Sequence, residues 1–122
     1  MRNPAGTILS CAALLLLVCA GGCHSPWVQT TVINQQDVPA KLVQVSYPGG
    51  TFGVQAIAAH SQYHYRFRIL ETGQMSIEFT DAAGHDHTVK GPELRPGQEG
   101  RLEIDIEPGQ TVSWQPHLTV RR

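Results

Sequence analysis

The stretch QYHYRFRILETGQMSIEFT, residues 62–80, decides the fold class. Its first half alternates apolar and polar side chains without a break: the apolar positions are Tyr63, Tyr65, Phe67 and Ile69, and the polar ones are His64, Arg66 and Arg68. A period of two places one set on each face of a β-strand. The segment ETGQ at 71–74 has the composition of a turn, and Met75, Ile77 and Phe79 resume the apolar face. We therefore predict an antiparallel hairpin whose four aromatic and aliphatic residues at 63–69 belong to the core.

This hairpin gives the arginines a structural role. If Ile69 pairs with Met75, Glu78 lies opposite Arg66, and a shift of two residues places it opposite Arg68. Either register forms a cross-strand pair of opposite charge, which stabilises a sheet.

The rest of the chain after residue 26 follows the same pattern. Glycine and proline recur every eight to twelve residues, and no helical period is present. Further strands are expected at 27–34, 41–47, 51–59 (with a bulge at Gly53), 87–90, 101–107 and 112–114, and a loop at 91–100. Val112 and Trp114 are expected opposite Ile106 and Ile104. We predict an all-β fold, an antiparallel, immunoglobulin-like β-sandwich of seven to eight short strands. An eight-stranded closed barrel is the alternative.

The N-terminus has the features of an export signal. Arg2 precedes an apolar run at 8–18, which is too short to cross a membrane as a helix, and small residues at 20–22 lead to Cys23. Cleavage before Cys23, whose sulfur would first receive diacylglycerol, gives a lipoprotein; cleavage after Ala20 gives an unmodified exported protein. Ala20 stands where a typical lipobox has leucine. However, the first cut removes Cys11 and Cys19 and acylates the third cysteine, so no free thiol remains.

These features predict the domain organisation: a signal peptide of lipoprotein type at 1–22, a lipid-anchored tether at 23–26 and a β-sandwich domain at 27–122. The anchor would comprise diacylglycerol and an N-acyl chain such as palmitate. Residue 24 is His rather than Asp, which in a Gram-negative organism favours the periplasmic face of the outer membrane.

Composition excludes some partners. Without Arg2 the chain has eight basic and ten acidic residues, a formal charge of −2, and no run of like charges. We expect no binding to nucleic acid and no polybasic membrane patch.

Two closely spaced histidines suggest an alternative function, metal binding. His85 and His87 lie two apart and would point to the same side of a strand, where with Asp81 or His64 they would bind Zn²⁺ or Cu²⁺. The competing interpretation is that 81–87 is a polar hairpin loop. Glu103, Asp105 and Glu107 alternate with Leu102, Ile104 and Ile106, so we interpret them as the solvent face of a strand. No serine lies in a recognisable nucleophile motif, so we expect no catalytic residue.

Four segments, YPGGTFGV (47–54), YHYRF (63–67), TDAAGHDHTVKGPEL (80–94) and GQEGRLEI (97–104), resemble small uncharacterised bacterial exported lipoproteins. The resemblance implies a single β-rich exported domain and assigns no activity, ligand or cofactor. The first hypothesis is thus a non-enzymatic, lipid-anchored cell-envelope protein that binds an envelope protein or polymer through a sheet edge or the loop at 91–100. The alternative is a periplasmic metal-binding protein.

Overall fold

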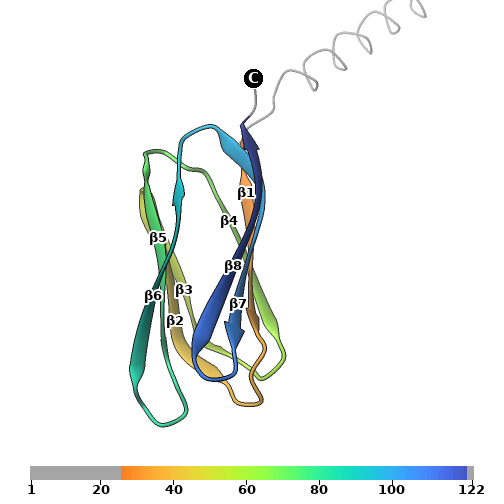
Figure 1. Cartoon of the computed structure of the whole chain (residues 1–122), viewed down its shortest axis with the longest axis vertical. Coiled ribbons are helices and arrows are strands. Elements are labelled where there is room, and N and C mark those ends of the chain that lie inside the picture. Colours follow the sequence, from red (N-terminus) through yellow and green to blue (C-terminus); the bar gives the residue numbers. More distant parts are fainter. Residues whose placement is uncertain (1–25, 121–122) are drawn as a thin grey trace, which may run out of the picture.

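The computed structural model describes residues 26–120, which form eight β-strands and no helix. No helix in this part of the chain could therefore cross a membrane. The strands follow one another with short connections (Figure 1). Their bounds are β1 Val28–Asn34, β2 Ala40–Tyr47, β3 Gly50–Ile57, β4 Gln62–Phe67, β5 Gly73–Thr80, β6 Asp86–Leu94, β7 Gln98–Glu107 and β8 Thr111–Val120.

The strands form two four-stranded sheets, which confirms the β-sandwich. One sheet, here sheet A, has the order β4-β1-β7-β8, and the other, sheet B, has the order β3-β2-β5-β6. Two separate sheets exclude the closed barrel for these residues. All neighbouring strands are antiparallel except β1 and β7, which are parallel. The purely antiparallel expectation is therefore corrected at that pair, and the immunoglobulin-like assignment stays a prediction.

The predicted hairpin at 62–80 is wrong. β4 pairs with β1 in sheet A, whereas β5 pairs with β2 and β6 in sheet B. Arg66 consequently faces Gln29, and Glu78 faces Gln44 and Thr88. The expected pair of opposite charges does not form, because residues 68–72 carry the chain from one sheet to the other. Alternation shows which face of a strand is buried, but it does not identify the neighbouring strand.

The core lies between the sheets and takes most of its side chains from β1, β2, β5 and β7. It includes the inward residues of β7 that the sequence predicted, Leu102, Ile104 and Ile106, each at most 1% exposed. Phe67 and Ile69 are also buried, but Tyr65 remains 36% exposed, so its assignment to the core was wrong. Tyr65 lies at the edge of sheet A, where its ring stacks on Phe52 of β3 at 4.2 Å.

Both edges of the sandwich bring aromatic rings between the sheets. At the β3–β4 edge, Tyr47 stacks on Phe67 at 4.0 Å, beside the stacked pair of Phe52 and Tyr65. Burial and hydrogen bonding to Tyr65 raise the pKa of Tyr47. At the β6–β8 edge, Trp114 lies against Gly91, where an added Cβ would be 2.6 Å from the indole ring. The absence of a side chain at residue 91 thus leaves room for the indole.

One predicted strand pairing is confirmed, and the predictions for Gly53 and for residues 91–100 are wrong. Ile104 pairs with Trp114 and Ile106 with Val112, as predicted. The ten-residue loop at 91–100 is wrong, because β6 continues to Leu94 and β7 begins at Gln98. Gly53 pairs regularly with Gln44, and the irregularity lies instead between β2 and β5 near Leu42, which has a positive φ of 49°.

Asn34 joins three segments at the end of the sandwich opposite the first and last described residues. Its side chain is fully buried, and its amide nitrogen donates to the carbonyls of Val38 (2.8 Å), Ile57 (3.0 Å) and Ala58 (3.2 Å). Its side-chain oxygen accepts from the backbone N–H of Gln36 at 3.1 Å. Asn34 therefore fixes the connection after β1 to the connection after β3.

Candidate functional site

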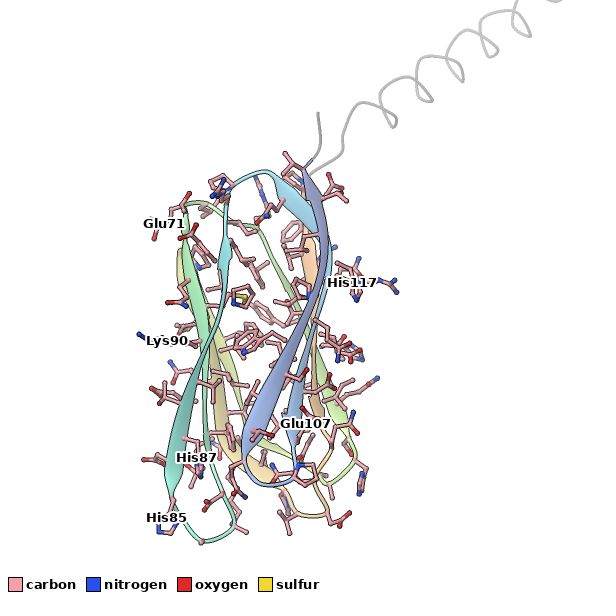
Figure 2. The ribbon with its side chains drawn as sticks, viewed as in Figure 1. Glu71, His85, His87, Lys90, Glu107 and His117 are labelled. Carbon is pink, nitrogen blue, oxygen red and sulfur yellow. The ribbon has the colours of Figure 1, made fainter. Side chains whose placement is uncertain are left out.

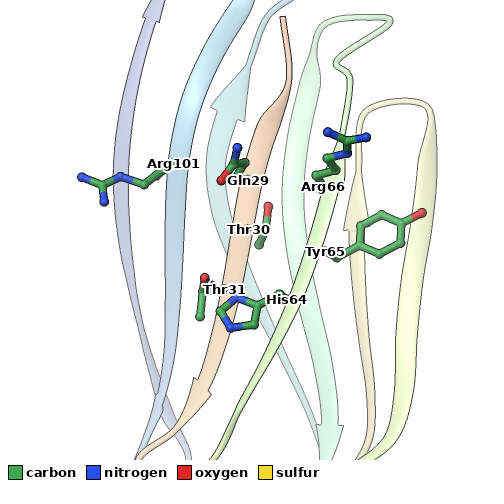
Figure 3. A pocket seen from close by; sticks show the side chains of 7 residues that line it. All are labelled: Gln29, Thr30, Thr31, His64, Tyr65, Arg66 and Arg101. Carbon is green, nitrogen blue, oxygen red and sulfur yellow. Dashed lines mark hydrogen bonds between the residues drawn. The ribbon is translucent and has the colours of Figure 1, made fainter.

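The outward face of sheet A carries a shallow hollow of about 600 Å³, which we call the arginine hollow. Its lining comes from three strands, β4, β1 and β7 (Figure 3). The lining residues are Gln29, Thr30, Thr31, His64, Tyr65, Arg66 and Arg101.

Strand pairing brings these residues together in two rows across the sheet. Gln29 of β1 lies between Arg66 of β4 and Arg101 of β7. In the next row, Thr31 pairs with His64, and Thr31 Oγ1 is 3.1 Å from His64 Nδ1. The parallel pairing of β1 with β7 places Arg101, which is far from Arg66 in sequence, one strand away from Gln29.

The chemistry of the hollow suits an anionic ligand. Of the seven described residues that line it, two are arginines and none carries a carboxylate. Guanidinium groups bind carboxylates and phosphates through paired hydrogen bonds, and Gln29 and Thr31 add neutral hydrogen-bonding groups. The guanidinium of Arg66 also lies 4.5 Å from the centre of the Trp27 ring, a cation–π distance that holds the side chain near its position.

The carboxylates of β7 lie beside the hollow, and one of them is buried although the sequence predicted that all face solvent. Asp105 is only 4% exposed, and it accepts hydrogen bonds from Gln35 Nε2 at 3.2 Å and Gln115 Nε2 at 2.9 Å. The two glutamine amides cover it because β7 is flanked on both sides. Hydrogen bonding to Asp105, burial and the like charge of Asp105 raise the pKa of Glu103. Asp105 is therefore a covered structural residue, and the interpretation as solvent face is corrected at this position, whereas Glu103 remains partly exposed.

The structure brings Asp81, His85 and His87 together at the β5–β6 connection, the end of the sandwich where Figure 2 shows both histidines. Asp81 Oδ2 lies 2.8 Å from His87 Nε2 and 3.8 Å from His85 Nδ1. Asp81 Oδ1 accepts hydrogen bonds from the backbone N–H groups of Ala83 and His85, both at 2.9 Å. These bonds close the hairpin connection and use the carboxylate that a metal ion would need, so the geometry favours the polar loop.

His64, the other candidate ligand, lies elsewhere. His64 is on β4, the edge strand of sheet A that adjoins β3. His87 is on β6, the edge strand of sheet B that adjoins β8, so the two histidines lie at opposite edges of the sandwich. Within residues 26–120, no group of three His, Cys, Asp or Glu residues is arranged to bind a metal ion. The lipidation candidate, Cys23, lies outside the described residues.

The hairpin contacts predict an acid-sensitive contribution to stability. Hydrogen bonding to His87 and to the backbone of His85 lowers the pKa of Asp81 to about 2. A depressed folded-state pKa contributes stability above the unfolded value, near pH 4, and this contribution is lost as the pH falls towards 2. We expect Asp81→Asn to be less stable than the wild type at pH 7, with the difference shrinking between pH 4 and pH 2. Urea denaturation at several pH values measures it, with Glu71→Gln, at an exposed carboxylate, as control. A difference that does not depend on pH would contradict this assignment.

Sequence reasoning did not find Gln29, Thr31 and Arg101 as site residues. It noted the polar alternation around His64 and Arg66, but it assigned both arginines of the segment to a hairpin. The alternation of WVQTTVIN at 27–34 and RLEIDIE at 101–107 was the available signal. That alternation shows which residues face outward and contains no information on which strands are adjacent.

Comparisons with known proteins bear on the fold alone. No family model and no curated protein sequence matches this chain. Among solved structures, the chain is similar to a protein from Eubacterium rectale determined by NMR, with a TM-score of 0.54 and 18% sequence identity. The match covers 77% of this chain and 93% of that one. At this identity the similarity supports the two-sheet architecture and carries no function.

Proposed function

We propose that this chain is a non-enzymatic, lipid-anchored protein of the bacterial cell envelope that binds an acidic polysaccharide through the arginine hollow. The proposal combines an anchor, which rests on the sequence around Cys23, with a binding face, which rests on the geometry of sheet A. The outward face of β4, β1 and β7 would then be the ligand-binding surface of the domain.

The observation that carries the binding role is the composition of the hollow. Arg66 and Arg101 lie on either side of Gln29 in the strand pairing, and none of the seven lining residues carries a carboxylate, although Glu103 lies beside the hollow as the partner of Thr31. The hollow is open along the face of a sheet and has no enclosing wall of loops, which suits a segment of an extended polymer better than a small molecule. A sugar carboxylate would accept from Arg66 or Arg101, and sugar hydroxyls would bond to Gln29 and Thr31.

The anchor is supported by the order of residues at the N-terminus. A basic residue, an apolar run of signal-peptide length and small residues precede Cys23, and no cysteine follows it. Acylation there would keep the domain at the membrane surface, with the arginine hollow facing the surrounding envelope.

Binding of a defined polymer tests this function. We expect the purified protein to bind polygalacturonate, a carboxylated polysaccharide, and not dextran, which is uncharged. The double variant Arg66→Gln/Arg101→Gln should bind about tenfold more weakly, because each exposed ion pair contributes up to about 1 kcal/mol. Binding is measured by titration calorimetry at low and at moderate salt, since screening weakens exposed pairs.

The matched control is Lys41→Gln/Lys90→Gln, which removes the same charge from sheet B. This variant should bind as the wild type does. If both double variants lose the same affinity, only net charge matters and the hollow is not the site. If the wild type binds neither polymer, the proposed ligand class is wrong.

A further inference from the structure

We propose that the end of the sandwich where the described chain begins is a membrane-contact surface that rests on anionic phospholipid headgroups. This surface, here the proximal end, comprises Trp27, Arg68, Leu70, Arg95 and Val120. The inference rests on the proposed anchor at Cys23 and goes beyond it, because an anchored domain need not touch the bilayer in one fixed orientation.

The position of Trp27 fixes how far the domain can lie from an acylated cysteine. The carbonyl of Trp27 accepts a hydrogen bond from the backbone N–H of Gly100 at 3.1 Å, so this residue is attached to the body of sheet A. Four residue steps separate it from Cys23. A fully extended chain of that length spans about 14 Å at most. Acylation of Cys23 would therefore hold the proximal end close to the headgroups.

Two of the three most exposed large apolar side chains of the described residues lie at this end. Leu70 is 70% exposed and lies beside the turn at Gly49, between β2 and β3. Val120 is 58% exposed and ends β8, beside Gln98 at the same end of the molecule. The other large apolar residue of comparable exposure, Leu42 at 61%, lies on β2, towards the opposite end. Exposed leucine and valine are unfavourable in water and favourable at a bilayer interface.

Trp27 supplies a second kind of interfacial group. Its ring has Arg66 at 4.5 Å and Arg68 at 5.9 Å, so an amphipathic aromatic lies beside two cations. Tryptophan is enriched at membrane–water interfaces, and arginine can place its apolar stem there while its charge meets phosphate.

The charges of the domain favour the same orientation. The described arginines, Arg66, Arg68, Arg95 and Arg101, all lie in the half of the sandwich that includes the proximal end. The same half holds Glu71, Glu93 and Glu99, of which Glu93 lies 3.8 Å from Arg95. The opposite half holds Lys41 against Asp37, Glu78, Asp81, Asp86, Asp105 and Glu107, while Lys90 and Glu103 lie near the middle. An anionic surface would repel that acidic half more strongly than the proximal half, which has four arginines and three glutamates.

Tryptophan fluorescence tests this orientation in the anchored protein. The chain has two tryptophans, and Trp114 lies between the sheets against Gly91, away from the proximal end. Protein extracted from membranes, with acyl mass on Cys23 established first, is placed in phosphatidylcholine vesicles with and without phosphatidylglycerol. Brominated acyl chains quench indoles at the interface. We expect strong quenching in the anionic vesicles and loss of most of it in Trp27→Phe.

Two further variants distinguish contact between the proximal end and the bilayer from attachment through the acylated cysteine alone. Leu70→Glu should reduce the quenching of Trp27, whereas Leu42→Glu, an equally exposed change far from this end, should leave it unchanged. Equal quenching of the acylated wild type and Trp27→Phe would overturn the inference while leaving the anchor intact. Absence of acyl mass on Cys23 would instead contradict the proposed anchor, and the inference would fall with it.

Discussion

Asn34→Asp is expected to lower the free energy of unfolding by about 4 kcal/mol at pH 7. The substitution keeps the size of the side chain but replaces an amide that donates to Val38, Ile57 and Ala58 with a carboxylate that cannot donate. A buried negative charge would then face carbonyl oxygens. A domain of this size has a total stability of roughly 5–15 kcal/mol, so the variant would be close to unfolding.

Urea denaturation followed by circular dichroism measures this loss. The loss should shrink at acidic pH, because a protonated carboxyl group can donate one of the missing hydrogen bonds. Gln55→Glu, an equivalent amide-to-carboxylate change at an exposed position of β3, is the control and should change stability little. If the two variants are equally stable, Asn34 does not hold the two connections together.

The second large effect is expected from Gly100→Ala, which should destabilise the domain by about 3 kcal/mol. Gly100 has a φ of 135°, a conformation that is strained for any other residue. An added Cβ would also overlap the carbonyl oxygen of His117 on β8 and lie 3.3 Å from Leu118 Cα. Because these are backbone atoms of the paired strand, relief of the overlap requires β7 and β8 to separate.

Gly109→Ala, in the same hairpin, separates the cost of the backbone conformation from the cost of steric overlap. Gly109 has a φ of 86°, but no atom lies within 4 Å of its would-be Cβ. We expect this control to cost about 1 kcal/mol, the conformational part alone. Thermal unfolding of the two variants gives the comparison. Equal melting temperatures would show that the close approach of β8 to Gly100 contributes nothing.

The fold class could be predicted because alternation is a local property. Leu102, Ile104 and Ile106 were recognised as inward residues, and their pairing with β8 followed from the short turn between the strands. The partner of β4 could not be recognised in the same way. Residues 71–74 have the composition of a hairpin turn, yet the chain crosses between the sheets at 68–72, and the aromatic rings of β4 pack on Tyr47 and Phe52 of sheet B.

The candidate site was largely beyond sequence reasoning for the same physical reason. Asp81, His85 and His87 are near in sequence, and they do lie together in space. The arginine hollow depends on β1 lying between β4 and β7, a non-local arrangement. His64 was noticed, but without that strand order it was assigned to a metal site rather than placed opposite Thr31.

The central place of β1 also has a mechanical consequence. The strand nearest the proposed anchor is an inner strand of sheet A, with six residue pairs to β4 and seven to β7. A pull on the tether would act along β1, while its hydrogen bonds run roughly across it, so both ladders would be loaded in shear. Many bonds would then resist together rather than open one after another. The order of the strands thus suits the proposed role of an anchored, polymer-binding domain, which would have to stay folded while drag on the polymer pulls it away from its point of attachment.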